Sequence, residues 1–135
     1  MDIEKLSQKF LVDGDVDPER LGHLIQQLLP YCVVRKNGAV DIVAGELSGK
    51  GQVKLVLAAR LVASKLKDST VSGEVTAEEI SQYTGLPKNQ AAARAKECVD
   101  DKFAERSARG SYRARDHKLD SFLPELSETR DSRAG

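Results

Sequence analysis

The sequence predicts a mostly helical α+β protein. Three observations in its second half predict this class: a helix N-capping box, a glycine–proline turn between two helices, and a basic hairpin after the second helix. In the capping box, the Thr76 hydroxyl and the Glu79 carboxylate satisfy each other's free backbone N–H groups. Gly85 then ends the first helix, because glycine readily adopts the left-handed conformation of a helix C-terminus.

The second helix begins after Pro87, whose ring already holds φ near the helical value. Its apolar residues recur at helical spacing and predict one buried stripe, formed by Ala91, Ala95, Cys98, Val99 and the following Phe103. The opposite face is polar and partly basic. We therefore expect the helix to pack along one side and to present polar side chains on the other.

Two short strand-like runs follow at residues 103–108 and 111–115, and Arg109-Gly110 joins them as a tight turn. The order of helix, turn, helix and basic hairpin resembles the winged helix-turn-helix domains of transcription regulators. The residues that carry the resemblance are Ile80, Thr84-Gly85-Leu86, Lys88-Asn89-Gln90, Phe103, Glu105-Arg106 and Gly110-Ser111-Tyr112. It implies a winged helix-turn-helix domain over residues 48–126, including a C-terminal helix.

Residues 1–47 are predicted to extend this domain with two helices and a β-hairpin. The helices cover residues 2–12 and 18–29, and Asp17 caps the second. In the hairpin, Asn37-Gly38 joins two β-rich runs at residues 31–36 and 39–43. We expect these elements to pack on the rest of the chain or on a second copy.

Two segments suggest ligand-binding loops, but their residues do not match the positions that the known motifs require. The alternating aspartates of residues 13–17 suggest a calcium loop, but Pro18 and Leu24 stand where that loop needs glycine and glutamate. Residues 45–51 suggest a phosphate-binding loop, but three residues rather than the required four separate Gly45 from Gly49-Lys50. The residue after Lys50 is glycine, so the side-chain hydroxyl of that motif is missing. We expect no metal and no cofactor, and we interpret residues 13–17 as a polar turn and residues 45–51 as a flexible connector.

The longest helix, residues 50–67, is apolar nearly all round, which indicates burial on more than one side. Residues 71–75 can add an edge strand to the basic hairpin. Residues 116–126 are predicted to form a weak helix with apolar side chains at Leu119, Phe122, Leu123 and Leu126, and Pro124 limits its length. The polar residues 127–135 are expected to form a disordered tail.

Charge is unevenly distributed along a chain whose net charge is zero. Residues 1–47 hold five Lys/Arg against eight Asp/Glu, a net charge of −3, whereas residues 86–118 hold nine against five, a net charge of +4. The positive charge therefore gathers where a winged helix meets phosphates. Cys32 and Cys98 are isolated and are expected to be reduced thiols.

No apolar run is long enough to span a membrane, and the N-terminus lacks the pattern of a signal peptide, so a cytoplasmic protein is expected. No small-molecule partner is evident. The two histidines are far apart, and no nucleophile motif or placed carboxylate pair is present. We therefore do not expect an enzyme.

The leading hypothesis is a transcription regulator that binds double-stranded DNA through a helix at 87–102 and a basic wing at 103–115. The residues expected to contact DNA are Lys88, Asn89, Gln90, Ala93, Arg94, Arg106, Arg109, Arg113, Arg115 and Lys118. The alternative is a winged-helix protein-interaction module within a transcription or RNA-processing assembly. The surplus of apolar surface on the N-terminal elements and the longest helix also suggests a homodimer.

Overall fold

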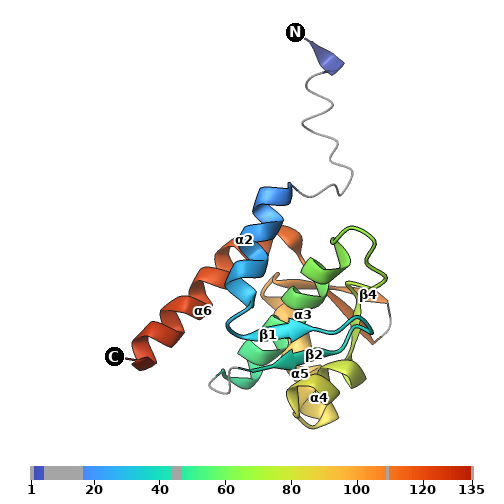
Figure 1. Ribbon diagram of the computed structural model, residues 1–135. Helices are drawn as coiled ribbons and strands as arrows, with labels where there is room; N and C mark the ends of the chain where they lie inside the picture. The colour runs from blue at the N-terminus through green and yellow to red at the C-terminus, as the bar shows by residue number, and fades with distance from the viewer. Residues whose placement is uncertain (1, 5–16, 44–46, 109, 135) are drawn as a thin grey trace.

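The computed structural model describes residues 2–4, 17–43, 47–108 and 110–134. This part of the chain contains five α-helices and two small antiparallel sheets (Figure 1). The mostly helical α+β class predicted from the sequence is therefore confirmed. No helix among the described residues is long and apolar enough to cross a membrane.

The central element is helix α3, Gly49–Ser64. The Ser48 hydroxyl caps it by accepting a hydrogen bond from the Gly51 N–H at 3.0 Å. Val53 and every residue of 55–63 are buried, and helices and strands pack around the helix on several sides. The prediction that this helix is buried on more than one side is confirmed.

The N-terminal elements pack on α3. Helix α2, Pro18–Leu28, is capped by the Asp17 carboxylate, and the hairpin of β1, Cys32–Val34, and β2, Val40–Ile42, follows it. The β1–β2 register places Val34 opposite Val40, and Gly38 adopts a φ of +94° in the turn. Buried side chains of these elements join those of α3 in one continuous core.

Helices α4, Ala77–Thr84, and α5, Lys88–Asp100, pack against each other and against α3. The predicted capping box is present, because Glu79 N–H donates to the Thr76 hydroxyl and Thr76 N–H donates to the Glu79 carboxylate, both at 3.1 Å. Gly85 has a φ of +79° at the end of α4. The capped start and the left-handed end of α4 are thus confirmed.

The second sheet has the order β3-β5-β4, with all strands antiparallel. Strand β3, Val75–Thr76, precedes α4, while β4, Ala104–Ala108, and β5, Ser111–Ala114, follow α5. Val75 pairs with Tyr112, so a strand before α4 does join the hairpin, but it covers Val75–Thr76 rather than residues 71–75. A register shift interrupts the β4–β5 ladder between Arg106 and Ala108.

A single 3₁₀ turn, Asp116–Lys118, leads into helix α6, Leu119–Ala134. This helix continues past Pro124 and through residues 127–134, where the polar sequence led us to expect a disordered tail. Leu119, Phe122, Leu123 and Leu126 are buried on both sides of the proline, and this packing outweighs the one helical hydrogen bond that proline removes. Figure 1 shows α6 beside α2 at one edge of the molecule.

Some expectations from the sequence lie outside the described residues. They are most of the first predicted helix, the aspartate-rich segment before Asp17, residues 45 and 46 of the glycine-rich connector, and Arg109 at the tip of the basic hairpin.

Candidate nucleic-acid interface

Helix α5 divides into the two faces that its sequence predicts. Ala91, Ala95 and Cys98 are fully buried against the core. On the other side, Lys88, Asn89, Gln90 and Ala93 are exposed, and Arg94 is half-buried. Amide and guanidinium groups on one open helix face can reach base edges in a major groove, which is wide enough to admit an α-helix.

The two cations of this face that the sequence predicted to contact DNA already have anionic partners. Lys88 Nζ lies 3.0 Å from Glu78 Oε1 of α4, and Arg94 Nη1 lies 2.8 Å from Glu97 Oε2 one turn further along α5. The Lys88 and Glu78 side chains are 67% and 77% exposed, so solvent screens this pair and its net contribution to stability is small. A contact of Lys88 or Arg94 with DNA would require the side chain to leave its carboxylate partner.

The first turn of α5 differs from that of α4. The N-cap residue Pro87 makes no side-chain hydrogen bond to the helix, whereas α4 has its complete capping box. The first N–H groups of a helix have no partner within the helix, and the helix dipole attracts negative charge to them. The start of α5 is therefore suited to a phosphate as well as to base contacts.

The acidic C-terminal end of α5 is partly neutralised from α3. Lys50 Nζ lies 2.8 Å from Asp101 Oδ2, and Lys54 Nζ lies 3.8 Å from the same oxygen. Burial acts to raise the pKa of Asp101, but the Lys50 ammonium and the Phe103 N–H outweigh it, so the pKa lies below its ordinary value. The sequence did not suggest this neutralisation, because the two lysines lie about fifty residues before the aspartate.

The arginines of the basic hairpin do not lie on one face. The β4–β5 register pairs Arg106 with Tyr112 and Glu105 with Arg113. Paired residues lie on the same face of a sheet, whereas successive residues along one strand lie on alternate faces. Arg106 therefore lies on the face of the buried Tyr112, with its guanidinium carbon 5.7 Å from the centroid of that ring. Arg113 lies on the opposite face with Glu105, and its guanidinium approaches Gly73.

The remaining residues that were expected to contact DNA are less exposed to solvent. Arg115 is half-buried, and its Nε approaches the Ala104 carbonyl at 3.5 Å. Lys118 is half-buried in the 3₁₀ turn rather than on the hairpin. One exposed cation that sequence reasoning missed is Lys96 on α5, and no ion pair among the described residues involves it. Lys96 directly follows the buried Ala95, so helical periodicity could have predicted that its side chain is exposed.

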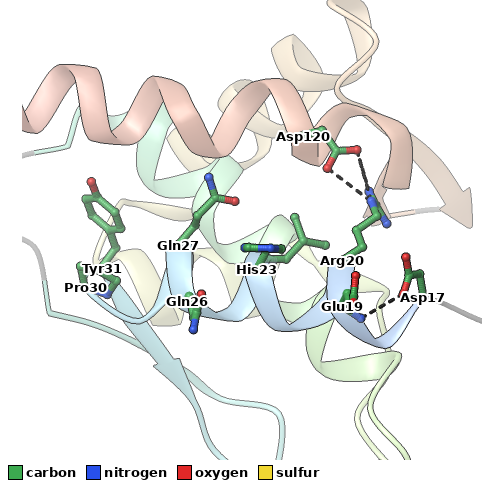
Figure 2. A pocket seen from close by; sticks show the side chains of 10 residues that line it. Asp17, Glu19, Arg20, His23, Gln26, Gln27, Pro30, Tyr31 and Asp120 are labelled. Atoms are coloured by element: carbon green, nitrogen blue, oxygen red, sulfur yellow. Dashed lines mark hydrogen bonds and ion pairs between the residues drawn. The ribbon is translucent and has the colours of Figure 1, made fainter.

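A separate polar hollow of about 1050 Å³ lies between α2 and α6. Figure 2 shows Arg20 of α2 reaching Asp120 of α6 across this hollow, with Nη2 and Oδ2 3.0 Å apart. Arg20 also donates to the carboxylate and the carbonyl of Asp116 at 3.0 Å each. Hydrogen bonding to Asp120 raises the pKa of Arg20. Its donors are thus used to hold the two helices together.

Both cysteines are buried and make no disulfide. Burial raises the thiol pKa of Cys32 to about 12 and that of Cys98 to about 11, so neither supplies a reactive thiolate at neutral pH.

Within the described ranges, no group of three or more His, Cys, Asp or Glu side chains is arranged to hold a metal ion. No protein-family model, curated protein or solved structure matches this chain.

Proposed function

We propose that this protein is a winged-helix transcription regulator that binds double-stranded DNA. The observation that carries the proposal is the exposed polar face of α5, with Asn89 and Gln90 at its open first turn, backed by a fully buried stripe. Helices α3, α4 and α5 in sequence, followed by a hairpin that pairs with a strand from before α4, also support it.

The proposed binding energy has two parts. Cationic side chains such as Arg106 contact phosphates and act on any sequence, because they release counterions from the duplex. Asn89 and Gln90 can each bond adenine bidentately, and Arg94 can bond guanine once it leaves Glu97. Only this second part selects a target site.

The test begins with selection of a preferred site from a random duplex pool, followed by fluorescence anisotropy over a salt series. Gln90→Ala should weaken binding to the selected site by about 1–3 kcal/mol and binding to random duplex very little. Gln26→Ala, at an exposed glutamine of α2, is the matched control and should change neither. Absence of enrichment, together with no binding to any duplex at low salt, would exclude DNA binding.

One observation favours a second candidate, a protein-interaction module. Lys88 and Arg94 are both held by carboxylates, and the adjoining exposed Ala93 gives α5 a small-residue surface suited to close approach by another protein. A partner recovered with the protein under salt conditions that remove nucleic acid would support this candidate, because phosphate contacts weaken steeply with salt.

A further inference from the structure

An apolar groove of about 620 Å³ lies away from α5, between strand β1 and the segment that follows α3. Its floor includes Ala59, Val62 and Ala63 of α3, all of them buried. Five large hydrophobic side chains are exposed among the described residues, and three of them line this groove: Leu29, Val33 and Leu66. Such a gathering of exposed apolar side chains is typical of a binding surface.

Strand β1 offers backbone hydrogen-bonding groups along the same groove. Val43 N–H donates to the Tyr31 carbonyl and Arg35 N–H to the Ala39 carbonyl, both at 2.8 Å. Bonded pairs alternate in an antiparallel ladder, so Cys32 and Val34 direct their N–H and C=O groups away from β2. Beyond the β1–β2 ladder, no hydrogen bond among the described residues involves Cys32 or Val34.

The rim of the groove is positively charged. Arg35, Lys36 and Lys67 line it together with one acidic residue, Asp68. Arg35 is paired with Asp41 at 2.6 Å, but none of the carboxylates that the structure describes forms an ion pair with Lys36 or Lys67. A second copy of the chain would bring the same unpaired lysines to the interface, which disfavours self-association here.

We propose that this groove binds an extended peptide of a partner protein, with alternating apolar and acidic side chains, as an added strand on the free edge of β1. The peptide backbone would bond Cys32 and Val34, its apolar side chains would cover Leu29, Val33 and Leu66, and its carboxylates would meet Lys36 and Lys67. This site shares no residue with α5, so it is independent of the proposed DNA binding.

The experiment uses a displayed library of random 12-residue peptides selected on the full chain, with the enriched peptides then synthesised. We expect sequences that alternate Asp or Glu with Val, Ile or Leu. Binding should fall tenfold or more for Lys36→Glu combined with Lys67→Glu, while the exposed Lys96→Glu on α5 is the matched control. Absence of enrichment, or enriched peptides that bind this double variant equally well, would overturn the proposal.

Two further measurements test the strand addition itself. Val34→Pro removes an N–H that β2 does not use, so it should weaken peptide binding tenfold or more while circular dichroism remains unchanged. Should that variant fail to fold, amide hydrogen exchange of the unmodified chain answers the same question. Added peptide should slow exchange at Cys32 and Val34 but not at Val33, which already bonds β2; equal slowing at all three, or none, would contradict strand addition.

Sedimentation velocity distinguishes the peptide from a second copy. The proposal predicts that Val34→Pro leaves the oligomeric state of the chain in solution unchanged. A dimer that Val34→Pro converts to monomer would show that a second copy occupies the groove, and the proposed occupant would then be wrong.

Discussion

Arg60 Nη1 lies 2.9 Å from Glu79 Oε2, and this contact joins the centre of α3 to the capping box of α4. The arginine is 5% exposed although the rest of its neighbourhood on α3 is apolar. Its remaining donors meet the carbonyls of Gly38, Ser72 and Glu74 at 2.8–3.1 Å. One side chain thus connects the β1–β2 turn, the segment before β3 and the start of α4.

Arg60→Leu should therefore destabilise the protein by roughly 3 kcal/mol or more. The change preserves apolar packing but leaves three carbonyls without their side-chain donor. It also removes the cationic partner of Glu79, whose carboxylate keeps the Thr76 N–H and the Tyr83 hydroxyl as donors. Urea denaturation followed by circular dichroism measures the loss. Arg113→Leu, at an exposed position of β5, should change stability by less than about 0.5 kcal/mol. Equal effects of the two substitutions would contradict a central role for Arg60.

Glu79 should make stability depend on pH in the acidic range. Burial acts to raise its pKa, but hydrogen bonds from Arg60 and from the Thr76 N–H outweigh burial, so the pKa lies below its ordinary value. A carboxylate of this kind stabilises the fold above its unfolded pKa of about 4.3, and the stabilisation is lost as pH falls through the folded value. Asp101 contributes in the same direction.

Glu79→Gln should consequently lower the free energy of unfolding at pH 7 and have a smaller effect at pH 3, where the native carboxylate is also becoming protonated. Urea titrations at the two pH values measure the difference. In an Arg60→Leu background the same substitution should change stability much less, since its main partner is gone. An effect of equal size at both pH values would exclude the proposed ionic contribution.

Lys102→Gly should stabilise the protein by about 0.5–1 kcal/mol. Lys102 has a φ of +71° just after α5, a conformation that is strained for a side chain with a Cβ and unstrained for glycine. The residue is exposed, so little packing is lost. Thermal melting should show a higher midpoint for Lys102→Gly and no such gain for Lys102→Ala, which keeps the Cβ. An equal gain for alanine would point to charge rather than backbone strain.

If the protein binds DNA as proposed, Arg106→Ala and Arg113→Ala should have unequal effects. They lie on opposite faces of the hairpin, and Arg106 shares the face of Tyr112, which is directed toward the core helices. Arg106→Ala should make the salt dependence of binding shallower by roughly one unit, because one phosphate contact is lost, while Arg113→Ala should leave the slope unchanged. Equal changes would mean that the hairpin meets DNA through its edge.

Local chemistry allowed the sequence to predict much of the α4–α5 region. The Thr76–Glu79 capping box and the left-handed Gly85 involve residues at most nine positions apart, so neighbouring side chains decide them. The buried stripe of α5 follows from helical periodicity alone. The C-terminal helix was predicted as far as Leu126 from its apolar positions, but its continuation through residues 127–134 was missed, because these residues are polar and show no apolar repeat.

By itself, the sequence determined the helices with strong caps, the two hairpins and the polar face of α5, because each depends on backbone preferences and on spacing within a few residues. Only the tertiary structure decided what depends on distant partners: the ion pair of Arg60 with Glu79, the neutralisation of Asp101 from α3, and the separation of Arg106 from Arg113. The last depends on strand register, since one residue of shift moves a side chain to the other face.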